Sequence, residues 1–267
     1  MRIKSKIAVS VVVLILSVSV VFAVDFPYRK DFPNVSYISS QDLKAKYDKN
    51  EVTIIDVRSK IEYDVIHINK SLHIPMAHAT FVDNVANLIK ENPKKVIAFY
   101  CNGITCLKSY ESAQKMMEAG HKNTFAYDAG VPEWSKLYPL ETIVLGKVLT
   151  DPGKQLISDN EFKKRLINFE TFKTKATEAN AVVIDVRDHI QSSGKLPGLE
   201  NAKTLPLDKF IPNFVAQKRD QDKTLLIFDQ VGKQVEWLMY YLQDYGYKNY
   251  FFLDKGATKV LQKQEYK

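Results

Sequence analysis

The chain has only two cysteines, Cys101 and Cys106, and both lie in one short stretch. Small exported domains that depend on disulfides carry many paired cysteines, so this sequence excludes a disulfide scaffold. A bridge between these two residues would close a short loop and remove little loop-closure entropy, so its contribution to stability would be small. The pair therefore indicates reactive thiols, with a Cys101–Cys106 disulfide as a resting or regulatory state.

The sequence also lacks a dense basic stripe with interleaved aromatic residues. It contains 38 Lys and Arg against 31 Asp and Glu, a formal net charge of +7. Three of the positive charges lie in the first six residues, so without residues 1–23 the net charge falls to about +4. This mild surplus favours a small anionic substrate and gives no basis for nucleic-acid binding.

Metal-ligand spacing is absent as well. The five histidines, His67, His73, His78, His121 and His189, are scattered along the chain. Catalytic and structural metal sites need several ligands that converge, often at short spacings. We therefore expect no metal and no other cofactor.

A single long apolar run is present, and it lies at the N-terminus. Residues 7–20 are apolar apart from serines, they follow basic residues, and the positions up to Ala23 offer small side chains to a signal peptidase. We predict that residues 1–23 are a signal peptide that directs the protein to the periplasm or another extracytoplasmic space. Because the run to Val24 approaches the length of a membrane span, an uncleaved N-terminal anchor is the alternative, and it would be the sole membrane attachment.

Strands and helices alternate along the first half of the chain. Short apolar runs predict strands at 52–55, 96–100 and 124–127, with a further short strand at 142–145, whereas 42–48 and 81–90 have helical patterns. Such alternation predicts βαβ units and a mainly parallel sheet. The fold class is therefore α/β.

The most informative part of the sequence is a strand–loop–helix pattern that ends at Gly120. Residues 96–100 are nearly all apolar, as in a strand covered on both faces, and Cys101 follows directly. Residues 102–105 have the composition of a loop. From about Cys106 the apolar residues recur at helical spacing, and the final glycine is a typical helix stop.

This pattern places Cys101 at the carboxyl end of a strand, facing the N-terminus of a helix. Ligand sites of open α/β sheets lie at that edge, and the free N–H groups of a loop and first helical turn bind anions. A thiolate is such an anion, so we expect a lowered pKa and a nucleophilic sulfur at Cys101. An inert buried thiol is the alternative.

The loop and its flanks resemble the persulfide-forming site of rhodanese-type sulfurtransferases. The residues that carry the resemblance, in chain order, are Asp56-Val57-Arg58, Glu62-Tyr63, His67-Ile68, Ile74-Pro75, the loop Cys101–Cys106, Gly120-His121-Lys122-Asn123, Asp128-Ala129-Gly130 and Trp134. The resemblance implies rhodanese-like three-layer domains, each a mainly parallel sheet flanked by helices. It also implies that Cys101 is the catalytic nucleophile.

The resemblance assigns roles to the residues around Cys101. Backbone N–H groups of the loop would hold the charged terminal sulfur, as an oxyanion hole holds oxygen. This persulfide-binding loop comprises Asn102, Gly103, Ile104, Thr105, Cys106 and Leu107. Lys108 and His67 are candidates for steering the anionic donor, and a structural role for His67 is the alternative.

The second half of the chain repeats the first. Residues 183–187 (VIDVR) repeat residues 54–58 (IIDVR), and Asp229 stands where the first half has Cys101. The chain ends soon after Gly256, which indicates that the second copy lacks its last helix. We predict a signal peptide at 1–23, a linker at 24–36, a catalytic rhodanese-like domain at 37–140, a second linker at 141–154 and an inactive rhodanese-like domain at 155–267.

Comparison of the two copies separates scaffold from chemistry. Asp56 and Arg58 recur as Asp185 and Arg187, so we assign them a structural role. Asp229 cannot carry a persulfide, and we expect its carboxylate to accept N–H groups of its own loop. The second copy is then inactive, and its expected roles are to wall off the mouth of the active site, to dock a partner or to stabilise the first domain.

We predict an exported sulfurtransferase. Cys101 attacks the outer sulfur of thiosulfate or a polysulfide and becomes a persulfide, and a thiophilic acceptor such as cyanide, sulfide or a thiol then takes the sulfur. Three alternatives stay open. A dithiol redox or sulfur-carrier protein would use Cys101 to attack and Cys106 to resolve, although the spacing differs from that of redox folds. A phosphatase would need an arginine clamp that the loop lacks, and a pure docking role would leave the Cys101 loop unexplained.

Overall fold

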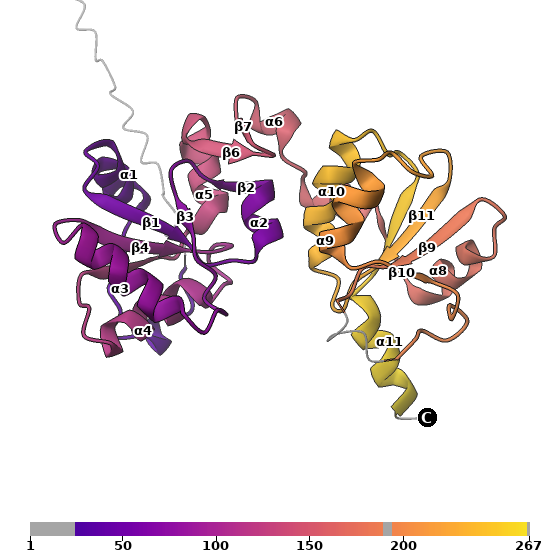
Figure 1. Cartoon of the computed structure of the whole chain (residues 1–267), viewed down its shortest axis with the longest axis horizontal. Helices are drawn as coiled ribbons and strands as arrows, with labels where there is room; N and C mark the ends of the chain where they lie inside the picture. Colours follow the sequence, from indigo (N-terminus) through magenta and orange to yellow (C-terminus); the bar gives the residue numbers. More distant parts are fainter. Residues whose placement is uncertain (1–24, 189–193, 266–267) are drawn as a thin grey trace, which may run out of the picture.

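The computed structural model describes residues 25–188 and 194–265, and every structural statement below concerns these residues. Figure 1 shows two α/β domains, the first coloured indigo to magenta and the second orange to yellow. The predicted signal peptide lies outside the described residues. Within the two described ranges, no helix combines the length and the apolar character needed to cross a bilayer.

The sheet of the first domain has four parallel strands. They are β1 (Val52–Asp56), β3 (Leu72–His73), β4 (Val96–Tyr100) and β5 (Thr124–Tyr127), arranged in the order β3-β1-β4-β5. β4 lies between β1 and β5, with Ile55 opposite Phe99 in the first pairing. The apolar runs therefore predicted the strands β1, β4 and β5 correctly, because a strand covered on both faces needs apolar residues at nearly every position.

Helices cover both faces of this sheet and produce the three-layer architecture predicted from the sequence (Figure 1). The helices are α1 (Ser40–Asp48), α2 (Lys60–Val65) and α5 (Gly130–Leu137) on one face, and α3 (Phe81–Glu91) and α4 (Lys108–Glu118) on the other. Trp134 of α5 is fully buried against the first face, and Met116 of α4 against the second. Ser39 caps α1 by accepting the N–H of Asp42.

The segments predicted to be linkers pack onto the first domain. In 24–36, the 3₁₀ turn Arg29–Asp31 brings Arg29 to Asp128, and Val35 is buried beside α3 and α4. In 141–154, β6 (Thr142–Val144) pairs antiparallel with β2 (Ile66–Ile68) and β7 (Lys147–Val148). Both segments are therefore built into the fold of the first domain, and β6 is the short strand predicted there.

The second domain repeats the first. Its five parallel strands are β8 (Leu166–Ile167), β9 (Ala181–Asp185), β10 (Lys203–Thr204), β11 (Thr224–Phe228) and β12 (Tyr250–Leu253), in the order β10-β9-β11-β12-β8. The first four strands in this order match β3-β1-β4-β5. The fifth, β8, matches the single parallel bridge from Tyr37 to Ala126 at the outer edge of the first sheet. The duplication seen in the sequence is thus a duplication of topology.

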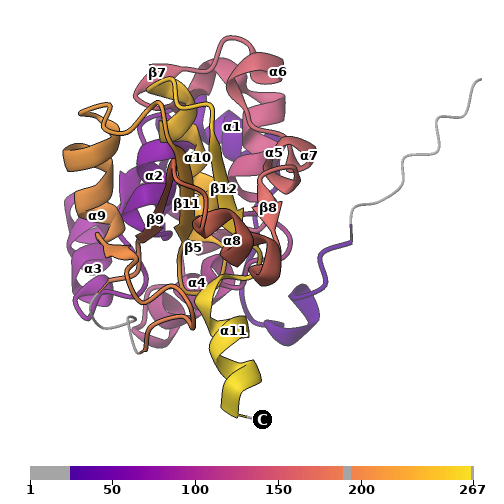
Figure 2. The ribbon, with the colours of Figure 1, turned by 90° about the vertical axis from the view of Figure 1, so that its right-hand side faces the viewer.

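The helices of the second domain correct the prediction about its end. They are α6 (Pro152–Gln155), α7 (Asp159–Lys163), α8 (Phe169–Ala176), α9 (Leu207–Phe210), the π-helical turn Ile211–Val215, α10 (Gln234–Asp244) and α11 (Gly256–Glu265). The prediction that this copy lacks its last helix is wrong, because α11 is present and Ala257 is fully buried (Figure 2). The counterpart of α1 in this domain is α8, which directly precedes the first central strand and is capped by Asn168, whereas α7, capped by Ser158, lies further upstream.

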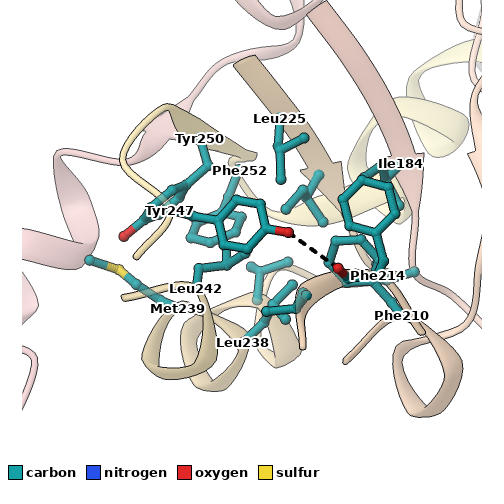
Figure 3. Close-up of a cluster of buried hydrophobic side chains, with 14 of the residues drawn as sticks. Ile184, Phe210, Phe214, Leu225, Leu238, Met239, Leu242, Tyr247, Tyr250 and Phe252 are labelled. Atoms are coloured by element: carbon teal, nitrogen blue, oxygen red, sulfur yellow. Dashed lines mark hydrogen bonds between the residues drawn. The ribbon is translucent and has the colours of Figure 1, made fainter. Parts of the chain in front are cut away.

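The second domain has a complete hydrophobic core of its own (Figure 3). Side chains from β9, β11, β12, α9 and α10 meet there, among them Phe210, Leu238 and Phe252. The hydroxyl of Tyr247 donates to the carbonyl oxygens of Phe214 and Arg219, at 3.2 and 2.8 Å. Burial of these large apolar side chains, each worth about 1.5–3 kcal/mol, stabilises the second domain.

The two domains meet where α10 packs against α2. Trp237 and Tyr241 of α10 contact the core of the first domain, and Ile61 of α2 contacts the core of the second. Burial, with the nearby carboxylates of Asp159 and Glu62, raises the pKa of Glu236 on the same helix. The second domain therefore lies directly against the helix that follows the Asp56–Arg58 motif.

Candidate active site

Cys101 lies where the pattern placed it, at the carboxyl end of β4. Its side chain is fully buried, and α4 begins at Lys108. The helix was predicted from about Cys106, two residues too early. The N–H of Cys106 donates to the carbonyl of Gly103 at 2.9 Å, so these residues form a turn and the first helical acceptor is the carbonyl of Leu107.

The structure joins Cys101 and Cys106 in a disulfide, with Cα atoms 6.3 Å apart. The Sγ atom of Cys101 lies 3.5 Å from the carbonyl oxygen of Cys106 and 3.7 Å from Oγ of Ser109. The oxidised resting state predicted from the sequence is thus compatible with the complete fold. Cys101 is a nucleophile only after this bond is reduced.

Ser109 is a site residue that the sequence analysis missed. It lies in the first turn of α4 and is fully buried beside the sulfur of Cys101. Alignment of α4 with α10 places Val235 at the equivalent position, so comparison of the two copies contained the signal. A hydroxyl there, together with the N-terminal N–H groups of α4 that have no acceptor within the helix, favours an anionic sulfur.

The turn at Gly130 packs against the backbone of the Cys101 loop. This residue has φ +62°, and a Cβ there would lie 2.5 Å from the N atom of Gly103. The N–H of Val131 donates to the carbonyl of Cys101 at 3.2 Å. The catalytic loop therefore rests on backbone that has no room for a side chain.

We expect Gly130→Ala to destabilise the first domain by about 2–4 kcal/mol, because it adds a clash to the cost of a left-handed residue. Gly120→Ala is the matched control, since Gly120 has φ +91° and open space around its Cβ position, and it should cost only about 1–2 kcal/mol. Gly256→Ala places an equivalent clash in the second copy. Chemical denaturation and sulfur-transfer assays of the three variants test this prediction. Equal losses of unfolding free energy for Gly120→Ala and Gly130→Ala would contradict it.

A buried ionic network connects the loop to the Asp56–Arg58 motif. The Arg58 guanidinium is fully buried, donates to both carboxylate oxygens of Asp56, and donates through Nη1 to Oδ1 of Asn102 at 3.0 Å. The amide nitrogen of Asn102 in turn donates to Glu62. Although burial opposes its charge, the Asp56 carboxylate raises the pKa of Arg58. The Asp56–Arg58 pair is therefore a buried ion pair that also holds Asn102, the residue that follows Cys101.

Glu62 completes the network from α2. It closes a capping box by accepting the N–H and hydroxyl of Ser59 as well as the amide of Asn102. Burial opposes ionisation, but the hydrogen bonds from Ser59 and Asn102 and the charge of Arg58 lower the pKa of Glu62. Its carboxylate is therefore charged at neutral pH and holds Asn102 from the side opposite to Arg58.

The two candidate steering residues differ in their surroundings. His67 is half-buried, its Nδ1 lies 2.7 Å from the carbonyl of Tyr63, and its ring stacks on that tyrosine. Burial lowers the pKa of His67, and this residue forms no hydrogen bond with loop residues 101–107 in the described parts of the chain. Lys108 is exposed at the start of α4 and forms no ion pair with another described residue. Lys108 is therefore the better placed of the two to attract an anion.

The loop presents an apolar rim to solvent. Ile104 and Leu107 are 40% and 36% exposed, and Thr105 is exposed between them. The loop thus combines a fully buried Cys101 with exposed apolar side chains. In the ranges 25–188 and 194–265, no group of His, Cys, Asp or Glu has the geometry to hold a metal ion.

In the corresponding loop of the second copy, the backbone N–H groups bind a carboxylate from the same loop. The carboxylate of Asp229 accepts the N–H groups of Gly232, Gln234 and Val235, which confirms the prediction made from the sequence. Burial raises the pKa of Asp229, and these three N–H groups oppose that shift. The N–H groups that would bind a substrate anion are therefore already occupied in this copy.

Comparison with known proteins places this architecture in a family. The model of the rhodanese-like domain matches the chain twice, over residues 39–137 and 168–263. The chain belongs to the rhodanese-like domain family. Both matches begin at the helix caps Ser39 and Asn168 and together cover most of this rhodanese-like chain.

Curated relatives match one half of the rhodanese-like chain. The tRNA uridine(34) hydroxylase of Erwinia tasmaniensis is 28% identical over 135 residues, 49% of this chain and 36% of the relative. The protein of the same name from Salmonella typhimurium is 26% identical over 141 residues, 51% of this chain and 38% of the relative. The matched region thus spans little more than a third of the length of these relatives.

Solved structures show a likeness at lower identity. Thiosulfate sulfurtransferase from Pseudomonas aeruginosa is 19% identical, with a TM-score of 0.38 over 87% of this chain and 45% of that one. The As-Sb reductase from Leishmania major is 18% identical, with a TM-score of 0.37 over 49% of this chain and 97% of that one.

Proposed function

We propose that this rhodanese-like protein is an exported sulfurtransferase that moves sulfane sulfur from thiosulfate or a polysulfide to a thiophilic acceptor. The observation that carries the proposal is the position of Cys101, buried at the end of β4 beside Ser109 and the N-terminus of α4. A thiolate in that position is stabilised by helix N–H groups and a hydroxyl, and it needs no cofactor to act as a nucleophile.

The reaction takes place in two steps. The thiolate of Cys101 attacks the outer sulfur of thiosulfate, the S–S bond of the donor breaks, and sulfite leaves with the bonding electrons. The outer sulfur of the resulting persulfide is then attacked by the acceptor, and the Cys101 thiolate is released. Loop N–H groups stabilise the negative charge on the terminal sulfur, and Lys108 attracts the anionic donor.

The substrate class follows from the chemistry around the loop. The relatives named as tRNA hydroxylases would imply a nucleic-acid substrate, but this sequence has no dense basic stripe. The site itself offers one cation, helix N–H groups and an apolar rim formed by Ile104 and Leu107. A small, soft anion with a sulfur–sulfur bond fits these features best.

The second domain is proposed to be inactive and to support the first. Asp229 replaces the nucleophile and occupies its own N–H groups. Helix α10 packs on α2, and α2 carries Glu62, which holds Asn102. The inactive domain thus supports α2, the helix that positions the active-site loop.

Initial-rate kinetics test the proposed function. We expect parallel lines in double-reciprocal plots when thiosulfate and cyanide are varied against each other with reduced Cys106→Ser protein, which cannot re-form the disulfide, because the persulfide separates the two half-reactions. Polysulfide should give the same pattern with a different slope. Intersecting lines, or equal activity in the fully oxidised protein, would contradict a Cys101 persulfide.

A further inference from the structure

The second cysteine of the loop has no role in simple sulfur transfer to cyanide. We propose that Cys106 is a second catalytic residue, which attacks the Cys101 persulfide, expels the sulfane sulfur as sulfide and leaves a Cys101–Cys106 disulfide. This inference rests on the proposed sulfurtransferase function. It extends that function to a reductive reaction whose physiological acceptor is an external dithiol.

The loop already has the geometry that this reaction requires. The two Cα atoms are 6.3 Å apart, within the usual range for bridged cysteines. In this disulfide-bonded structure β4 runs to Tyr100, and the carbonyl of Cys101 accepts the N–H of Val131. Cys106 therefore reaches the inner sulfur of a persulfide without a rearrangement of the sheet or of the turn that supports it.

The chemistry balances without an added oxidant. The Cys106 sulfur attacks Sγ of Cys101, and the bond between Sγ and the outer sulfur breaks. The outer sulfur departs with the bonding electrons and takes the proton of the Cys106 thiol, so it leaves as hydrosulfide. The two cysteines together lose two electrons, and the sulfane sulfur gains them.

The different burial of the two sulfur-bearing residues sets the direction of the return step. Cys101 is fully buried, whereas Cys106 is only half-buried at the outer side of the loop. An external dithiol therefore attacks the sulfur of Cys106, and Cys101 leaves as a thiolate beside Ser109 and the N-terminus of α4. A stabilised thiolate is the better leaving group, so reduction regenerates the nucleophile directly.

The two copies support a shared role for the two thiols. Six residues separate Cys101 from the start of α4, and four separate Asp229 from the start of α10. The inactive copy thus lacks the nucleophile, the second thiol and two residues of loop together. The longer loop in the first copy provides the turn from Gly103 to Cys106 that brings the second sulfur back to the first.

A single-turnover experiment tests the proposal. The full chain is reduced, freed of reductant, mixed with thiosulfate in the absence of an acceptor, and assayed for free sulfide and intact mass. For the wild type we expect about one sulfide per chain and a mass about two hydrogens below that of the reduced protein. Cys106→Ser should release no sulfide and should instead gain about one sulfur atom, which cyanide or a dithiol removes.

The outcomes separate this inference from the proposed function. A wild type that accumulates a stable persulfide and releases no sulfide would overturn the role of Cys106 while the sulfurtransferase function stands. Failure of both proteins to take up sulfur would overturn both. The wild-type measurement is decisive even if a variant folds poorly, and Cys106→Ala provides a second test of the same thiol.

Discussion

Cys101→Ser should reduce sulfur transfer from thiosulfate to cyanide by at least about 10³-fold, because a serine hydroxyl does not form the persulfide on which the reaction depends. Steady-state assays of reduced protein measure this loss. When wild type and variant are compared in the reduced state, neither has the bridge, so their free energies of unfolding should be nearly the same.

Cys106→Ser is the matched control for this loss. It removes the other end of the same disulfide but keeps the Cys101 thiol, so its rate of sulfur transfer to cyanide should far exceed that of Cys101→Ser. If Cys101→Ser kept most of the activity, or if both variants lost it equally, the assignment of Cys101 as the nucleophile would be wrong.

Arg58→Leu should destabilise the first domain by about 3–5 kcal/mol, because it leaves the Asp56 carboxylate charged and buried without its partner. It also removes the donor to Asn102, so the molecules that remain folded should have a lower kcat/KM. Chemical denaturation followed by tryptophan fluorescence, to which the buried Trp134 and the interdomain Trp237 contribute, measures the first effect. Activity assays without denaturant, in which the protein is folded, measure the effect on kcat/KM.

Arg187→Leu breaks the equivalent pair in the second domain. Arg187 donates to Asp185, but its Nη1 atom has no hydrogen-bond partner among the described residues, whereas the same atom of Arg58 holds Asn102. This variant should therefore be similarly destabilising and should leave the kcat/KM of the folded first domain much closer to that of the wild type. Equal loss of kcat/KM in the two variants would show that the contact to Asn102 does not position the loop.

The sequence predicted the parts of the fold that local chemistry determines. β1, β4 and β5 follow from short apolar runs, and the position of Cys101 follows from the strand that it ends. The start of α4 could not be placed as well, because the turn between Gly103 and Cys106 uses residues that also suit a helix. Local preference alone does not choose between these two structures.

Most of the structural features that the sequence did not predict depend on long-range contacts. Arg58 and Glu62 lie near each other in sequence, but Asn102 is 44 and 40 residues away from them, and only the folded chain brings it to this pair. The segment 141–154 has the glycines and prolines of a linker, yet β6 completes a sheet with β2. Comparison of the two copies was the one part of the sequence analysis that could predict such features. It identified Asp229, and applied to α4 and α10 it would also have identified Ser109.

The most direct test of the account is the intact mass of Cys106→Ser protein after thiosulfate and then after cyanide. This variant retains the nucleophile and has no neighbouring thiol to expel the sulfur. We predict a gain of about one sulfur atom per chain that cyanide removes and that is absent when Cys101 is also replaced by serine. No gain in fully reduced, folded protein would contradict a persulfide at Cys101 and, with it, the sulfurtransferase function.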